Sequence, residues 1–334
     1  MKFVASVIFL AIATSGTLLT AGPVFTFQSV TDPTGNNVIQ LLGINNAGTI
    51  AGFDDNNPAL GFTLALPNNF TAENYPASAS TMVTGINQNG STVGIYVDAA
   101  NNTHGFTDIG GTFQTVDNPA SAIFNQGLGI NDSNTTVGYY APTQAGQTGQ
   151  IAYSQAGGTF TDVNALLPSN VNSQAVGIND AGNIVGFYMP TGATSIGFTD
   201  FGGAIGTVDP FSSTFTQALG INDLGEIVGV YTDAGGDQFG YVDIGGAFTS
   251  VDPFGSTNVT VNGLNDLGQI VGFYTDANSN TVGFVGTATP EPYTSSLAGA
   301  ALLAVGLLGI RRRRSSCPAR LPRNRFPAER FGPT

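Results

Sequence analysis

Between residues 25 and 287 the apolar positions fall into short runs that end at Gly, Asn, Asp or Pro. In one representative stretch these runs cover residues 216–222, 226–232, 238–244 and 247–252. Each run is rich in β-branched and aromatic residues, which is typical of strands that are bounded by turns. No part of this region has the period of an amphipathic helix. The pattern therefore predicts an all-β domain.

The strand pattern occurs six times, and each unit contains a version of the phrase Gly-Ile-Asn-x-x-Gly-x-x-x-Gly. The phrases begin at Gly43, Gly85, Gly129, Gly177, Gly220 and Gly263. Their successive spacings are 42, 44, 48, 43 and 43 residues. A period of about this length is typical of a four-stranded propeller blade. We therefore expect a six-bladed β-propeller over residues 25–287.

The two ends of the array are complementary. The sixth unit stops after its third strand, at Gly283-Phe284-Val285, whereas residues 25–33 match the fourth strand of the fifth unit and precede the first phrase. We predict that this N-terminal strand completes the last blade, which removes an exposed sheet edge. An open β-solenoid with an N-terminal cap is the alternative.

The N-terminus has the order of a secretory signal peptide. Met1-Lys2 is followed by an apolar run over residues 3–13 and by small residues up to Ala21. We expect residues 1–21 to be cleaved, because the run is too short to span a bilayer comfortably. An uncleaved anchor is the alternative.

Near the C-terminus, Thr289-Pro290-Glu291-Pro292 precedes an apolar stretch, Leu297 to Ile310. Four arginines follow it directly: Arg311, Arg312, Arg313 and Arg314. The stretch is long enough for a transmembrane helix in a slightly thinned bilayer, and the arginines place its end in the cytoplasm.

Residues 289–314 resemble the PEP-CTERM sorting signal of Gram-negative bacteria, which has Pro-Glu-Pro, a short membrane helix and an Arg cluster. The resemblance implies processing near Pro290, Glu291 and Pro292 by an exosortase, after transient anchoring in the membrane. It further implies delivery to the cell surface or an exopolysaccharide matrix. Thr289 stands where the family has Val, and a disordered basic tail is expected over residues 315–334. An ordinary membrane anchor is the alternative.

The repeated phrase also resembles the HAF-type repeats of bacterial extracellular proteins. Gly-Phe replaces their His-Ala-Phe at residues 61–62, 105–106, 197–198 and 283–284. This resemblance implies no catalytic residues.

Charge narrows the possible partners. The net charge is −13, and no Lys or Arg occurs between Lys2 and Arg311, whereas 20 of the 22 acidic residues lie between Asp32 and Asp276. Such a domain repels nucleic acid and other polyanions, so nucleic-acid binding is not expected. Cys317 is the only cysteine, and the body can therefore form neither a disulfide nor a thiolate metal site.

Most candidate functional residues recur in several units, which favours a structural role. We expect the turn aspartates and the preceding asparagines to cap their own turns. The aspartates are also weak calcium candidates, because their oxygens are hard ligands. They are Asp132, Asp180, Asp223 and Asp266.

Three further features of the sequence bear on ligand binding or catalysis. The recurring tyrosines Tyr96, Tyr140, Tyr188, Tyr231 and Tyr274 are expected in the core rather than in a sugar-binding platform. His104, the only histidine, is expected to be a solvated loop residue, since one histidine cannot form a cluster. Residues 141–150 and 163–173 break the repeat and are expected to be longer loops on a binding rim.

The sequence therefore favours a non-catalytic secreted protein of the cell surface or exopolysaccharide matrix, which displays a binding or structural module and needs no cofactor. A glycoside hydrolase or lyase on the same scaffold is one alternative. A calcium-stabilised adhesion domain is another. The expected partners are an exosortase, the membrane before processing, and extracellular polysaccharide.

Overall fold

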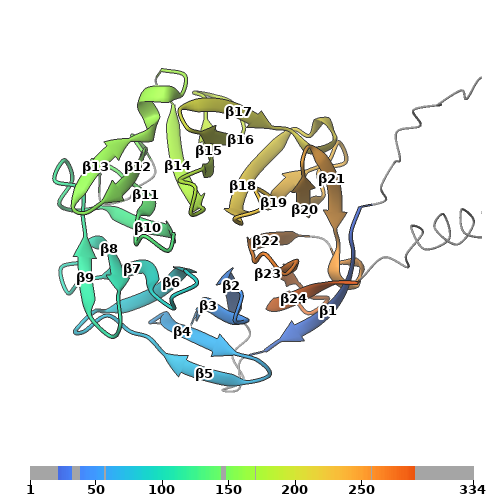
Figure 1. Ribbon diagram of the computed structural model, residues 1–334, viewed down its shortest axis with the longest axis horizontal. Helices are drawn as coiled ribbons and strands as arrows, with labels where there is room; N and C mark the ends of the chain where they lie inside the picture. The colour runs from blue at the N-terminus through green and yellow to red at the C-terminus, as the bar shows by residue number, and fades with distance from the viewer. Residues whose placement is uncertain are drawn as a thin grey trace, which may run out of the picture. The chain divides into compact units, whose positions relative to one another are not determined.

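The computed structural model describes residues 22–31, 38–55, 58–143, 148–169, 171–256 and 258–289. These residues form six four-stranded antiparallel sheets arranged as blades around one axis, as Figure 1 shows. The fold is thus the predicted six-bladed β-propeller rather than an open solenoid.

Each blade begins at the axis and runs outward in sequence order. Blade 1 contains β2 (Ile39–Ile44), β3 (Thr49–Asp54), β4 (Leu60–Ala65) and β5 (Asn69–Ala72). Blade 2 contains β6 (Ser80–Ile86), β7 (Thr92–Val97), β8 (Thr103–Asp108) and β9 (Phe113–Val116). Blade 3 contains β10 (Asn125–Ile130), β11 (Thr136–Tyr140), β12 (Ile151–Ala156) and β13 (Thr159–Asp162).

The other three blades follow the same plan. Blade 4 contains β14 (Asn172–Ile178), β15 (Ile184–Met189), β16 (Ile196–Phe201) and β17 (Ala204–Val208). Blade 5 contains β18 (Phe215–Ile221), β19 (Ile227–Thr232), β20 (Gln238–Ile244) and β21 (Ala247–Val251). Blade 6 contains β22 (Val259–Leu264), β23 (Gln269–Thr275), β24 (Thr281–Thr289) and β1 (Val24–Val30). Three 3-10 turns complete the elements: η1 (Val163–Leu166), η2 (Pro210–Ser212) and η3 (Pro253–Gly255).

The N-terminal strand closes the ring as the sequence predicts. β1 pairs antiparallel with β24, with Val24 opposite Thr289 and Val30 opposite Gly283. β1 is therefore the outermost strand of blade 6, and β24 has no open edge along this ladder.

The core lies between neighbouring blades. Each of the larger buried clusters joins side chains of one blade to those of the next: Val137 of blade 3 packs with Ala175 of blade 4, Val185 of blade 4 with Ala218 of blade 5, and Val228 of blade 5 with blade 6. Burial of this kind stabilises each blade only in the presence of its neighbours.

At the axis, the first glycine of each repeated phrase touches its counterpart in the next blade. A Cβ on Gly177 would lie 3.2 Å from the Gly220 Cα, and a Cβ on Gly263 would lie 3.0 Å from the Gly43 Cα. Only glycine permits backbones to approach this closely. The phrase therefore begins with Gly because six inner strands converge there.

The predicted signal peptide, the sorting-signal residues Pro290 to Pro292, the helix over 297–310, the arginines and the tail lie outside the described residues. Within the part of the chain that the structure describes, no helix is long and apolar enough to cross a membrane.

Candidate functional site

The axis of the propeller holds a cavity that the innermost strands of all six blades line. In every blade the pairing of the innermost strand with the next shifts register just before the Gly-Ile-Asn phrase, as between Leu41 and Gly43. Such a bulge leaves one residue unpaired and redirects its side chain. The six bulged residues line the axial cavity: Leu42, Thr84, Leu128, Val176, Leu219 and Asn262.

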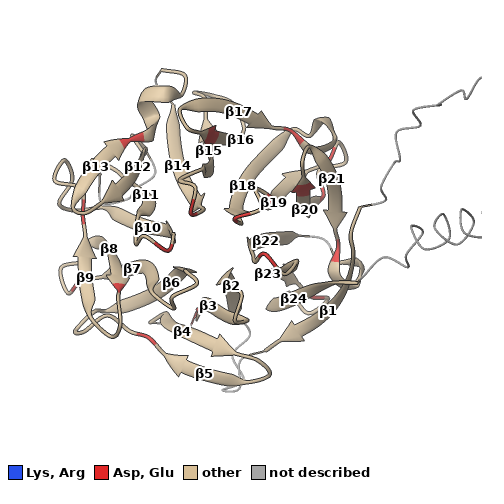
Figure 2. Ribbon diagram, in the orientation of Figure 1, with Lys and Arg blue, Asp and Glu red and all other residues tan. Residues whose placement is uncertain are grey.

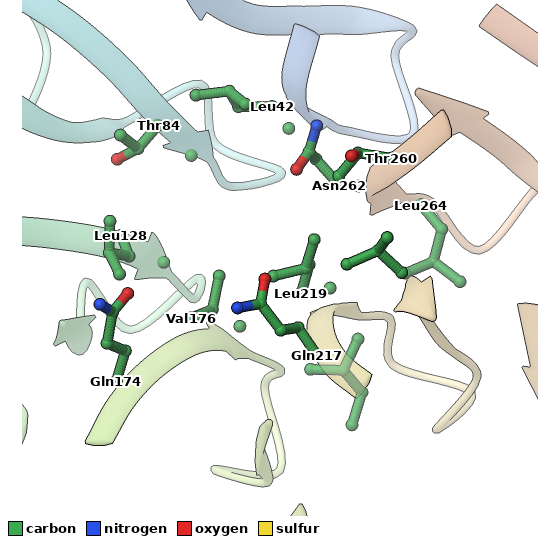
Figure 3. Close-up of a pocket in the computed structure, with 18 of the residues that line it drawn as sticks. Leu42, Thr84, Leu128, Gln174, Val176, Gln217, Leu219, Thr260, Asn262 and Leu264 are labelled. Atoms are coloured by element: carbon green, nitrogen blue, oxygen red, sulfur yellow. The ribbon is translucent and has the colours of Figure 1, made fainter. Parts of the chain in front are cut away.

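The cavity has a volume of about 410 Å³, and Figure 3 shows aliphatic, hydroxyl and amide side chains around it. Amide side chains of the inner strands, among them Gln174 and Gln217, belong to this lining. The Thr84 hydroxyl donates to the Gly127 carbonyl at 2.8 Å, and the Asn262 amide donates to the Leu41 carbonyl at 3.1 Å. Among the described residues that line the cavity there is no carboxylate, histidine or cysteine. The cavity can therefore bind uncharged groups, and its side chains offer no acid, base or nucleophile beyond hydroxyls.

One end of the cavity is closed by a ring of asparagines. Each donates its side-chain amide to the backbone carbonyl of the corresponding asparagine in the next blade, at 2.9–3.2 Å, and the sixth donates to the first. Each side-chain oxygen also accepts the backbone N–H four residues later in its own turn. The ring consists of Asn45, Asn87, Asn131, Asn179, Asn222 and Asn265. The predicted turn cap is confirmed, and the link between blades is an addition that the sequence did not reveal.

The residue after each asparagine forms a second ring around the same mouth. Asp180 accepts the backbone N–H of Asp132 at 2.8 Å, Asp223 accepts that of Asp180 at 2.8 Å, and Asp266 accepts that of Asp223 at 3.0 Å. Gln88 and Asn46 complete the ring in blades 2 and 1. The expectation that each aspartate caps its own turn was therefore wrong, because the carboxylate accepts from the preceding blade instead.

The four weak calcium candidates are thus brought together around one mouth, which is hollowed by about 60 Å³. Burial raises the pKa of Asp132 and of Asp223; the backbone N–H that each carboxylate accepts opposes this shift, and the charges of neighbouring aspartates add to it. Each carboxylate already accepts a backbone N–H. Among the described residues no group of three or more His, Cys, Asp or Glu side chains is placed to hold a metal ion. The ring therefore does not fit a compact calcium site.

The described residues of the two segments predicted as binding loops, 141–143, 148–150, 163–169 and 171–173, lie at the opposite end of the blades, among the connections between second and third strands and between successive blades. We call this end the loop face, and the end that carries the asparagine ring the turn face. A hollow of about 520 Å³ on the loop face is lined by Thr148, Gly149, Val171, Asn172 and residues 189–193. Residues 163–166 form η1 rather than an open loop.

His104 is not the solvated loop residue that the sequence suggested. It lies in β8 with its side chain 13% exposed, and its Nδ1 is 2.6 Å from Asp117 while its Nε2 is 3.3 Å from Asp98. Its ring stacks on Tyr96 at 4.8 Å. Burial opposes protonation, but the hydrogen bonds and charges of Asp117 and Asp98 outweigh it and raise the pKa of the imidazole.

Like His104, Glu73 departs from the residue type found at its position in other blades. It lies where blades 1 and 2 pack together, and we call such a contact between neighbouring blades a seam. By register it occupies the position of Val116 and Val208, which are buried. Burial raises the pKa of Glu73, while a hydrogen bond from the Thr92 hydroxyl opposes this effect. The charge of Asp108 raises the pKa further.

The recurring tyrosines are buried, as predicted. Tyr96, Tyr140, Tyr188, Tyr231 and Tyr274 have exposed fractions of 7–9%. They therefore contribute to packing between strands and do not form an open platform for a sugar.

The chain matches no protein-family model and no curated protein sequence. Solved structures share its fold at low identity. A putative TolB from Agrobacterium tumefaciens is 12% identical, with 76% of this chain and 91% of that chain covered and a TM-score of 0.52. The SapL1 lectin in complex with alpha methyl fucoside is 13% identical, with 77% and 98% covered and a TM-score of 0.49. A mutant of the Aleuria aurantia lectin in complex with Fucalpha1-6GlcNAc is 11% identical, with 77% and 98% covered and a TM-score of 0.45. The likeness to the putative TolB extends to the fold alone.

Proposed function

We propose that the protein is a non-catalytic binding module that is secreted and then displayed on the cell surface or in an exopolysaccharide matrix. The observation that supports a binding role is the axial cavity. Its six bulged side chains are leucines in three blades, whereas Thr84, Val176 and Asn262 occupy the same position in the other three, and a glycine follows every one of them. Variation among side chains that line one cavity allows a scaffold built from repeats to select a ligand.

The same cavity supports binding over catalysis. Glycoside hydrolysis uses two carboxyl groups on either side of the scissile bond, and the lining contains aliphatic and amide groups instead. The carboxylates nearest to it belong to the repeated ring on the turn face, where each accepts a backbone N–H.

Incubation of the full-length protein with neutral and acidic polysaccharides tests the non-catalytic role. Retention of at least one polymer without new reducing ends or unsaturated products would support a binding module. Release of either product by the purified chain would identify a hydrolase or lyase and overturn the proposal.

Sorting rests on Pro290-Glu291-Pro292, the apolar stretch and Arg311 to Arg314. In a Gram-negative host that has an exosortase, we expect released protein to lack residues from about 293 onward. Mass spectrometry of that protein decides the matter. Peptides that contain Cys317 or Arg320 on the mature form would indicate a plain membrane anchor.

A further inference from the structure

Two phenylalanines on the loop face are exposed at equivalent positions. Phe211 and Phe254 lie 43 residues apart, in η2 and η3, which connect blade 4 to blade 5 and blade 5 to blade 6. Their exposed fractions are 54% and 56%. Both follow an Asp-Pro pair, so the same turn presents the same ring twice.

The backbone of both residues is in the left-handed region, with φ of 59° at Phe211 and 62° at Phe254. Bulky side chains rarely adopt this conformation, which Gly and Asn adopt at lower cost. An exposed aromatic ring that is kept in such a backbone at two sites calls for an explanation beyond loop closure.

Each phenylalanine ring packs against inner aromatic side chains on one side and is exposed to solvent on the other. The Phe211 ring is 5.0 Å from that of Tyr231 and 6.2 Å from that of Phe248. The Phe254 ring is 5.4 Å from that of Tyr274 and 6.1 Å from that of Phe27. These contacts hold the rings in place, as a stacking surface requires.

Polar groups accompany each ring. The Tyr231 hydroxyl is 3.0 Å from the Ser250 hydroxyl, and the Tyr274 hydroxyl is 3.2 Å from the Ser29 hydroxyl. An exposed aspartate precedes each Phe by two residues: Asp209 and Asp252. The two serines and the two aspartates are exposed, so they can form hydrogen bonds with a hydroxylated ligand, while the buried tyrosine hydroxyls orient the serines.

The negative charge of the described residues limits the class of ligand that can bind. The described residues contain acidic side chains but no Lys or Arg, as Figure 2 shows, so an anionic polymer would be repelled. An exposed aromatic face beside hydroxyls and carboxylates suits the apolar C–H face and the hydroxyls of a sugar. Two identical surfaces on neighbouring blades suit a ligand that itself repeats.

We propose that Phe211 and Phe254 are paired stacking platforms for an uncharged polysaccharide on the loop face. This inference rests on the proposed binding role and adds a ligand class and a second site, distinct from the axial cavity.

The test uses affinity electrophoresis of the full-length protein in gels that contain dextran, glucomannan or xylan, with alginate as the anionic polymer and a chelator present throughout. The informative variant is the double substitution Phe211→Asn and Phe254→Asn. Asn removes the rings and tolerates the left-handed backbone, so the protein should keep its thermal midpoint. Each single substitution should weaken retention by an uncharged polymer about tenfold, and the double substitution should weaken it further.

A matched control exists on the opposite face of the same blades. Leu224 and Leu267 are 67% and 66% exposed, and replacing both by Asn should leave retention unchanged. Phe211→Tyr with Phe254→Tyr should retain binding, because the aromatic surface remains.

Several outcomes would overturn the platforms. They are equal retention of the Asn double variant and the wild type, equal loss in the Leu variant, binding to alginate alone, or no retention by any uncharged polymer. A fall in thermal midpoint with unchanged retention would assign the rings a purely structural role. Failure of the platforms leaves the sorting and product-release tests untouched, so the two proposals fail separately.

Discussion

Six glycines, six asparagines and six following polar side chains surround the axis, and each touches its counterpart in the next blade. The seams farther out contain Glu73 and His104, which have aliphatic residues at the same register in other blades, such as Val116 and Ile196. Both regions are built from the same repeat, yet only the axial glycines and asparagines are the same in all six blades.

The difference follows from how many blades share a contact. A ring residue binds the blade before it and the blade after it, so a change in one blade requires a change in its neighbours. A seam residue joins two blades and can change alone. We therefore expect substitutions at the axis to cost more than substitutions at the seams, and seam substitutions that restore the repeat to stabilise.

The largest effect is expected for Gly177→Val. A Cβ there would lie 3.2 Å from the Gly220 Cα and 3.2 Å from the Ile221 nitrogen, and backbone atoms shared by two blades cannot move aside easily. Overpacking of this kind should lower the free energy of unfolding by about 3 kcal/mol or more. Chemical denaturation measures it. The control is Val176→Ala, whose side chain faces the cavity; an equal loss there would mean that glycine contact is not the cause.

A smaller effect is expected for Asn179→Ala. The substitution leaves the buried Asn222 carbonyl and the Asn183 N–H without the partners that Asn179 provides, both at 3.0 Å. The Asn222 carbonyl would keep only the Gly225 N–H, and the loss of these two hydrogen bonds should lower the free energy of unfolding by about 2 kcal/mol. Asp180→Asn keeps a side-chain oxygen for the Asp132 N–H and should change the free energy of unfolding little. Equal stability of Asn179→Ala and wild type would show that the ring does not hold the blades together.

The sequence anticipated the repeat, the six blades and the closure by β1 because strand periodicity and a missing fourth strand are local features of the chain. In blade 5 the predicted strands agree with the structure to within one residue. The partner of the Asp180 carboxylate could not be predicted, because the Asp132 N–H lies 48 residues away in another blade. The partners of His104, Asp98 and Asp117, are only 6 and 13 residues away, but placing His104 in a loop rather than in β8 hid their convergence on its ring. The exposed Phe211 had a signal, its recurrence after Asp-Pro at Phe254, but recurrence alone suggests packing.

At the seam of blades 1 and 2, Glu73→Val should stabilise the protein by about 1 kcal/mol at neutral pH, as substitutions that restore a repeat consensus often do. Burial raises the pKa of Glu73, so its folded form favours the protonated acid. The contribution of Glu73 to stability is therefore present at low pH and is lost as the pH rises through the folded pKa. The stabilisation by Glu73→Val should therefore grow as the pH rises through the folded pKa of Glu73. Thermal unfolding at several pH values tests this, with Glu73→Gln as the variant that removes the charge but keeps a partner for Thr92.

The smallest effect, below about 1 kcal/mol, is expected for His104→Gln, which removes the charge but leaves a hydrogen-bonding side chain toward Asp117 and Asp98. Because the folded pKa of His104 is raised, the imidazolium stabilises the fold below the unfolded pKa, and this stabilisation is lost as the pH rises through the folded value. The Asp98 carboxylate, whose pKa is lowered to about 2 chiefly by the backbone N–H of Asn102, remains charged throughout this window. Asp117 has a raised pKa, mainly from burial, so its protonation sets the acidic limit. The stability difference between wild type and variant should peak between the titration of Asp117 and that of His104. A difference that is constant with pH would show that His104 acts by packing on Tyr96 alone, as the aliphatic residues of the other blades do.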